Sequence, residues 1–408
     1  MATATPSPHH ASRARRALGA ALRTCAAPLL LALAACATPP DPATQALLRD
    51  AAYRAPQEAP PTPAELTSLS PAMQRFLAAQ GWAQAPQRDA RRALIHALYQ
   101  PRAAGGPGLR LEYESARTRT AAEAFEAGSG NCLSLVLLTT ALARQLELPV
   151  AFQAVLTPDT YSLAGTLTLA SGHVNVVLGP RATPGTLYRS EPDPLVIDFL
   201  PSRELGVRPT RPLQEATVLA MFFNNRAVEL LAQGRVDDAY WHARQALALD
   251  TGFLPAANTL GVVHLRAGQA EAAEQAWRHV LAADARSVPA LRNLLGLLRQ
   301  QARTAEAEPL AARLAALQPV APFQWLLAAR DALALGDTAG AVRLLQRELQ
   351  QQPEHPEVHA ALAMAHLRQG DAALARQHLQ LAARHSTLRS DQQRFEAKLG
   401  LLGSAPSP

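Results

Sequence analysis

The sequence is poor in lysine, in cysteine and in aromatic residues, and each scarcity excludes a class of protein. Lys398 is the only lysine among 408 residues, so a Walker A phosphate loop, which needs a Gly-Lys pair, is excluded. The three cysteines, Cys25, Cys36 and Cys132, form no Cys-x-x-Cys pair, which excludes a cysteine-rich zinc module and a disulfide scaffold. Aromatic residues make up 5% of the chain, and no basic patch is interleaved with them, which argues against nucleic-acid binding.

Hydrophobic residues, by contrast, make up 48% of the chain and charged residues 18%. This balance excludes a fully disordered protein, and the length is ample for two or three packed domains. The formal net charge of +6 arises mostly at the N-terminus, where residues 1–35 contain four arginines and no acidic residue. The charge therefore indicates a targeting segment rather than a nucleic-acid surface.

Residues 1–36 have the composition of an export signal. A basic stretch, residues 13–16, precedes a short apolar run that ends at Cys36, and this run is far below the ~20 residues that span a bilayer. Residues 33–36, Leu-Ala-Ala-Cys, resemble the lipobox of bacterial lipoproteins. The resemblance implies that Cys36 is diacylated and becomes the mature N-terminus, and Ala37 favours the periplasmic face of the outer membrane. A soluble secreted protein cut after Ala-x-Ala is the alternative.

The next segment, residues 37–69, contains two proline-rich stretches. Proline removes backbone donors and favours extended chain, so we predict a spacer with at most one short helix. No other stretch of the sequence reaches transmembrane length.

A period of 34 residues governs the chain from residue 220 onward. Five consecutive units, 220–253, 254–287, 288–321, 322–355 and 356–389, each predict a helix, a turn and a second helix. One column holds Gly234, Gly268, Ala302, Gly336 and Gly370, and another holds Ala239, Ala273, Ala307, Ala341 and Ala375. The glycine column predicts a helix C-terminal turn, and the alanine column predicts close contact between two helices.

This pattern resembles the tetratricopeptide repeat, whose period and small-residue positions match. The resemblance implies an all-α solenoid whose concave surface binds a protein or peptide partner. Residues 390–408 are expected to contain a capping helix and a tail. The histidines of this half are scattered over different repeat positions, so we expect neither a metal site nor a cofactor there.

Residues 70–212 have a different character and predict an α+β domain. Helices are expected over residues 87–99, 120–127 and 132–146, the second of them opened by Thr120 and Glu123 at capping-box spacing. Strands are expected over residues 150–155, 173–178 and 195–200.

A candidate catalytic site follows from three residues of this domain. Cys132 begins the predicted third helix, where the helix dipole and free backbone N–H groups favour a thiolate and a developing oxyanion. His173 and Asp198 lie on following strands and supply a base and a group to orient it. Asp193 is a rival orienter, and Asn131 and Gln153 either assist the oxyanion or only cap and pack. A lone cysteine can also be a plain buried residue.

The stretch from Thr120 to Ser134, with residues 152–153, 172–174 and 196–198, resembles the bacterial transglutaminase-like domain, a branch of the papain-like cysteine peptidase fold. The resemblance implies that Cys132 is the nucleophile, His173 the base and Asp198 its partner. Many transglutaminases have tryptophan after the cysteine, where this chain has Leu133, so hydrolysis is favoured over cross-linking.

The sequence thus predicts an α+β transglutaminase-like domain followed by an all-α repeat solenoid. The favoured function is that of a lipid-anchored periplasmic cysteine peptidase or amidase whose repeats bind protein. The alternative is a non-catalytic envelope adaptor with a degenerate cysteine domain.

Overall fold

The structure is a computed structural model that divides the chain into residues 1–41 and residues 42–408. It describes residues 42–82, 87–99, 108–109, 111–114, 117–164, 167–179, 194–199, 209–317, 324–351, 353–386 and 389–403. The predicted signal peptide and Cys36 lie outside these ranges.

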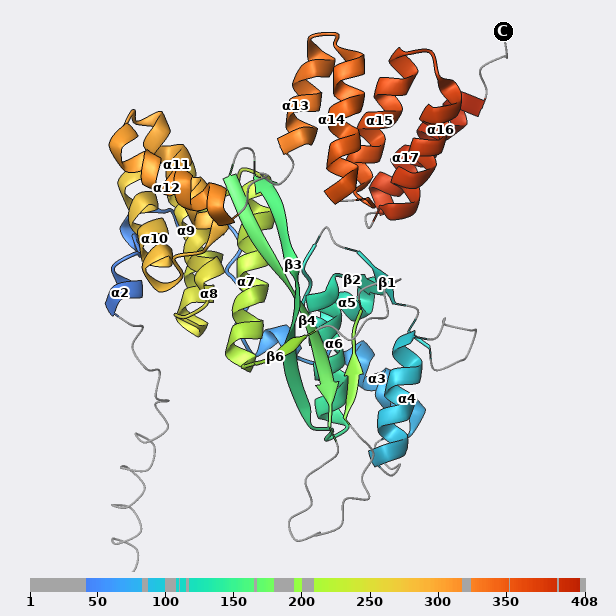
Figure 1. The fold of residues 1–408 in the computed structure, drawn as a ribbon. Helices are drawn as coiled ribbons and strands as arrows, with labels where there is room; N and C mark the ends of the chain where they lie inside the picture. The colour runs from blue at the N-terminus through green and yellow to red at the C-terminus, as the bar shows by residue number, and fades with distance from the viewer. Residues whose placement is uncertain are drawn as a thin grey trace, which may run out of the picture. The chain divides into compact units, whose positions relative to one another are not determined.

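An antiparallel four-stranded sheet forms the centre of the α+β region, in the order β5-β4-β3-β6. Its long members are β3 (Val150–Ala164) and β4 (Leu167–Leu178), which run together as the green ribbon in Figure 1. The shorter members are β5 (Leu195–Ile197) and β6 (Thr210–Leu213). The three predicted strands are therefore present, although β3 and β4 extend well beyond the predicted ranges. The third is shorter than predicted, because β5 ends at Ile197 and Asp198 lies just beyond it.

The described residues of this region form four α-helices: α3 (Pro71–Gln80), α4 (Gln87–Tyr99), α5 (Ala121–Ala127) and α6 (Cys132–Gln145). The predicted capping box is confirmed, because the Thr120 side chain accepts from the Glu123 N–H while the Glu123 side chain accepts from the Thr120 N–H. Helix α6 packs against β4, and most of its residues are buried. A short parallel pair, β1 (Glu112–Tyr113) and β2 (Ser129–Gly130), precedes it.

The C-terminal region consists of paired helices, as the repeat period predicts (Figure 1). In chain order these are α7 (Glu215–Ala232), α8 (Val236–Leu249), α9 (Leu254–Arg266), α10 (Ala270–Ala283), α11 (Val288–Gln300), α12 (Thr304–Leu317), α13 (Gln324–Ala334), α14 (Thr338–Gln351), α15 (Pro356–Arg368) and α16 (Ala372–His385). The capping helix is α17 (Arg389–Gly403), whose Phe395 is buried against α15 and α16. No helix within the described ranges is both long enough and apolar enough to cross a bilayer.

Both small-residue columns have the predicted roles. The four glycines of the first column have φ between 75° and 84°, a left-handed conformation that glycine adopts without steric cost. Ala302 has the same kind of conformation, with φ of 56°, so the third repeat keeps its turn without glycine. All five alanines of the second column are buried, as close helix contacts require.

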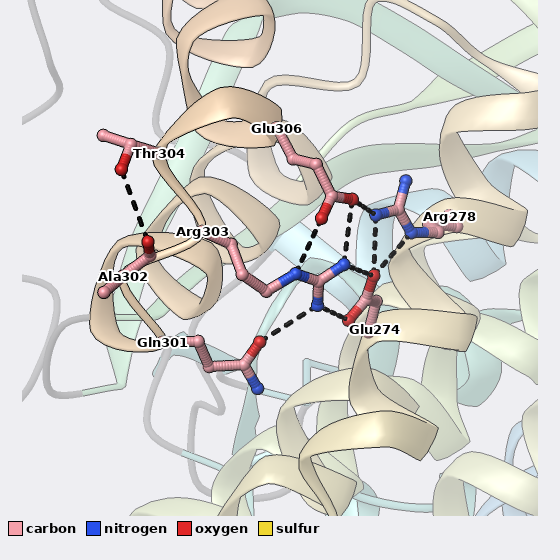
Figure 2. Close-up of polar contacts among 7 residues, drawn as sticks. All are labelled: Glu274, Arg278, Gln301, Ala302, Arg303, Thr304 and Glu306. Atoms are coloured by element: carbon pink, nitrogen blue, oxygen red, sulfur yellow. Dashed lines mark hydrogen bonds and ion pairs between the residues drawn. The ribbon is translucent and has the colours of Figure 1, made fainter.

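An ion-pair network joins the second and third repeats beside this alanine turn (Figure 2). Arg303 contacts Glu274 of α10 at 2.6 Å and Glu306 of α12 at 2.8 Å. Arg278 contacts the same two carboxylates. A network of this kind stabilises more than an isolated surface pair does, and it holds the degenerate third repeat against its neighbour.

The first repeats and the α+β region share one hydrophobic core. Strand β4 packs on α7, α9 and α11, and Phe222 and Phe223 of α7 are almost fully buried. Polar contacts add to this, because the Thr118 N–H donates to Glu229 at 2.7 Å and Arg144 pairs with Glu215 at 2.6 Å. The two regions that the sequence divides therefore fold against each other.

Residues 42–57, which we call the strap, bind along the first two repeats. Within the described part of the range predicted as a spacer with at most one helix, the chain forms three short helices, α2 (Pro42–Gln45), η1 (Asp50–Ala52) and η2 (Glu65–Thr67). The Tyr53 ring stacks on Tyr240, with centroids 3.9 Å apart. Strap backbone groups bond to side chains of α8, such as Asp238. These side chains accept from strap N–H groups, so the strap is held against the repeats by hydrogen bonds as well as by the ring stack.

Candidate functional site

Cys132 is the first residue of α6, and the turn before it is built for that position. The Asn131 side chain caps the helix, because its Oδ1 accepts from the Ser134 N–H at 2.9 Å and from the Ser134 hydroxyl at 2.8 Å. Its Nδ2 donates to the Thr118 hydroxyl at 2.8 Å. Both ends of the Asn131 amide are thus engaged. The sequence left two roles for Asn131, assisting the oxyanion or capping the helix, and the structure supports capping.

Gly130 is required by the same turn. A Cβ atom at this position would lie 2.6 Å from the Ser134 Cβ, closer than two carbon atoms approach in proteins. The Gly-Asn-Cys sequence therefore has a physical cause: glycine lets the chain pass close to the helix, and asparagine caps the helix that begins at the cysteine.

His173 of β4 lies between Cys132 and Asp198. Its Nε2 is 2.7 Å from the Asp198 Oδ1, and its ring also forms a hydrogen bond with the Cys132 side chain. Cys132 is a free, half-buried cysteine, and the His173 side chain is 7% exposed. The structure thus brings the three predicted site residues together from α6, β4 and the end of β5.

The pKa of His173 shows how these neighbours act. Burial by itself lowers the pKa of the imidazole, but the hydrogen bonds and charges of Asp198 and Cys132 outweigh burial and raise it to about 9. The arrangement therefore favours an imidazolium at neutral pH, beside a sulfur that can carry the negative charge. Such a pair can attack a carbonyl carbon and then protonate a leaving group.

The backbone around Asp198 is held by α4. The Tyr99 hydroxyl donates to the Asp198 carbonyl oxygen at 3.0 Å, and the Tyr99 ring stacks on Phe199. The Asp198 side chain is 40% exposed, so solvent screens part of its interaction with His173. Asp193, the rival orienter, lies outside the described residues.

Two further polar residues of the sheet lie opposite each other, Gln153 on β3 and Asn175 on β4. Asn175 is two residues beyond His173 on the same strand and is 3% exposed. Its Oδ1 has no hydrogen-bond partner among the described residues. Gln153 is half-buried, and no hydrogen bond between its side chain and Cys132 is found in the described part of the chain.

The sequence analysis missed one residue of this site, Tyr113. Strand β1 pairs with β2 so that Tyr113 lies opposite Gly130. Gly130 is two residues before Cys132 in the chain. The Tyr113 hydroxyl accepts a hydrogen bond from the Cys132 backbone N–H. Nothing in the sequence marks this tyrosine, because a two-residue strand has no detectable periodicity.

No group of three or more histidine, cysteine, aspartate or glutamate side chains in the described ranges has the geometry to hold a metal ion. The histidines of α15 and α16 instead stack on one another. The rings of His359 and His378 are 5.4 Å apart, and those of His366 and His378 are 5.5 Å apart. Burial and the neighbouring imidazoles lower the pKa of His378 to about 4, so the His378 imidazole is neutral at pH 7.

Comparison with known proteins supports the repeats. Residues 230–298 and 332–399 match the tetratricopeptide repeat family, and the C-terminal region thus contains tetratricopeptide repeats. No curated protein matches the sequence significantly.

Solved structures with matching regions include PilF of Pseudomonas aeruginosa, at 21% identity and a TM-score of 0.28, covering 45% of this chain and 84% of that one. A thermophilic repeat protein of Thermus thermophilus, TTC0263, matches at 19% identity and a TM-score of 0.30, covering 44% and 98% of the respective chains. The MamA protein matches at 16% identity and a TM-score of 0.24, covering 48% and 100%.

Proposed function

We propose that this chain is a thiol-dependent acyl-transfer enzyme, a cysteine peptidase or amidase of the transglutaminase-like kind. Cys132 is its nucleophile, His173 its base and Asp198 the group that orients His173. The observation that carries the proposal is the position of His173, whose ring bonds to Asp198 at 2.7 Å and also to the Cys132 side chain. A structural cysteine has no need of such a pair.

The chemistry follows from these contacts. His173 takes the proton of the Cys132 thiol, and the Cys132 sulfur attacks the carbonyl carbon of an amide, whose π electrons move to the oxygen. As the intermediate collapses, His173 gives its proton to the leaving amine and a thioester remains on Cys132. Water then attacks the thioester while His173 takes its proton, which releases the acid and restores the thiol. Leu133, in place of a tryptophan, favours water over an amine as acceptor.

The tetratricopeptide repeats supply a protein-binding scaffold beside this site. Repeats of this kind generally bind proteins or peptides, so a protein or peptide is the partner that this chain would take. In the proposed function the repeats bring a protein substrate, or a second envelope protein, to the cysteine domain.

The proposal places the protein in the cell envelope, attached by a lipid on Cys36 to the periplasmic face of the outer membrane. Palmitate supplied to cells that express the full chain should label the protein, and Cys36→Ser should abolish the label. A label that survives the substitution would contradict the lipid anchor.

Acylation of Cys132 tests the enzyme itself. We expect p-nitrophenyl acetate to release a burst of one nitrophenolate per protein and to leave one acetyl group, detected by mass, on the peptide that contains Cys132. The matched control is Cys132→Ser, which keeps the size of the side chain and should lose the burst. A wild-type protein that alkylates with iodoacetamide no faster than a free thiol and gives no burst is instead the non-catalytic adaptor.

A further inference from the structure

Tyr113, the residue that the sequence analysis missed, lies beside the proposed nucleophile Cys132. The backbone bonds Glu112 N–H to Gly128 O, at 2.9 Å, and Glu114 N–H to Gly130 O, at 3.0 Å, hold Tyr113 alongside the turn before α6. Its hydroxyl oxygen accepts from the backbone N–H of Cys132. The side chain thus lies on the amide of the nucleophile rather than on open surface.

The Cys132 N–H is where an oxyanion would bind. The first N–H groups of a helix have no partner within it, and a carbonyl oxygen attacked by the Cys132 sulfur would form its charge beside that N–H. An effective oxyanion site needs a second donor. The Asn131 amide, a candidate in sequence, is committed to Ser134 and Thr118.

We propose that Tyr113 is the second oxyanion donor of the thiol site. In the resting protein its hydroxyl occupies the place on the Cys132 N–H that the substrate oxygen takes. When the acyl group binds, the substrate oxygen accepts from the Cys132 N–H, and the Tyr113 O–H turns to donate to the same oxygen. No proton leaves the tyrosine: the proton for the leaving group still comes from His173. This role rests on the proposed function.

The surroundings keep the Tyr113 hydroxyl protonated, which is the form that can donate a hydrogen bond. Burial, together with the nearby Cys132 and Asp198 charges, raises the pKa of Tyr113 above its usual value. The phenol is therefore neutral at any pH at which the thiol site would work, and its proton is available to a developing negative charge.

Two reactions of the Cys132 sulfur distinguish an oxyanion donor from a residue that only supports the structure. Acylation by p-nitrophenyl acetate passes through an oxyanion, whereas alkylation by iodoacetamide displaces iodide and forms none. Tyr113→Phe removes only the hydroxyl. We expect it to slow the acylation burst by about 100-fold and to leave the alkylation rate at neutral pH unchanged. The unchanged alkylation also shows that the variant is folded, because it needs His173 in place.

The matched control is Tyr53→Phe, the same change at a tyrosine whose hydroxyl contacts His264 on α9; it should leave both rates unchanged. The oxyanion role is overturned if Tyr113→Phe changes neither rate, slows both rates equally or speeds both. Faster acylation together with faster alkylation would mean that the tyrosine blocks the site. Failure of the proposed function looks different, because the wild-type protein itself then gives no burst, and that result overturns the oxyanion role with it.

Discussion

At the scale of single residues, the chemistry depends on how His173 is surrounded. A buried histidine normally loses its charge, since burial disfavours the cation. Here the Asp198 carboxylate, 2.7 Å from Nε2, and the Cys132 side chain reverse that effect and raise the pKa of His173 to about 9. The imidazolium is therefore present over the whole neutral range, and two variants can test its effect on the sulfur and on stability.

The first prediction concerns the reactivity of Cys132. His173→Ala removes the cation and should slow alkylation by iodoacetamide near pH 7 by about tenfold or more, because a free cysteine is only a few per cent thiolate there. Asp198→Ala should slow it less, since the Asp198 side chain is 40% exposed. The measurement is the alkylation rate against pH for the three proteins. His279→Ala on α10 serves as control, and three superimposable curves would contradict the site.

The second prediction concerns stability and pH. Because folding raises the pKa of His173 from 6.5 to about 9, the stabilisation from its contacts is fully present below about pH 6.5 and is lost as the pH rises through about 9. Asp198→Asn should therefore lower the urea midpoint clearly at about pH 6 and hardly at all at about pH 10. Asp331→Asn, at an exposed position on α13, should show no such difference. An equal loss at both pH values would mean that the carboxylate does not face an imidazolium.

At the scale of elements, the repeats depend on one small residue per helix pair. Ala273 of α10 is fully buried in the column of alanines that recurs in every repeat. A neighbouring glycine, Gly261 of α9, shows how close the helices are, because a Cβ there would lie 2.4 Å from the Trp277 ring nitrogen. The helix pair has no spare volume at this contact.

The third prediction follows from this packing. Ala273→Trp should destabilise the protein by roughly 1–3 kcal/mol or more, because overpacking forces side chains and backbone to move. Thermal or urea unfolding measures the change. The same substitution at the exposed Ala283, on the same helix, should stay within about 0.5 kcal/mol of the wild type. Equal stability of the two variants would contradict the register of the repeats.

At the scale of the whole molecule, the strap joins distant parts of the chain. His264 holds it with both ring nitrogens: Nε2 is 3.1 Å from the Leu47 carbonyl oxygen and Nδ1 is 2.7 Å from the Tyr53 hydroxyl. The carbonyl can only accept, so Nε2 carries the proton and Nδ1 accepts from Tyr53. A neutral His264 therefore satisfies both contacts, and burial indeed lowers the pKa of this histidine to about 4.

The fourth prediction is that acid and Tyr53→Ala both release the strap. Because the docked state holds the pKa of His264 near 4, its stabilisation is present above about pH 6.5 and declines as the pH falls toward 4. Hydrogen exchange by mass spectrometry should find the Arg49, Arg54 and Gln57 amides protected at about pH 7.5, since each donates to α8. Tyr53→Ala should remove that protection, whereas Tyr99→Ala, at a tyrosine outside the strap, should not. Unchanged exchange in Tyr53→Ala would show that the strap does not depend on the Tyr240 stack.

Local patterns alone predicted the repeats and the position of Cys132 at the start of a helix, whereas His173 and Asp198 were predicted from their place on later strands and from the family resemblance. A period of 34 residues, a capping box and a cysteine after Gly-Asn are each readable over a few turns of chain, because helix propensity and capping act between near neighbours. The helix over residues 120–127 and the helix that begins at Cys132 followed from them. Only the tertiary structure decided that Tyr113 lies on the Cys132 amide, that the strap binds the first repeats, and that α7 shares its core with the sheet. These contacts join residues far apart in the chain, and their stability comes from the burial and pairing of side chains that no local period records.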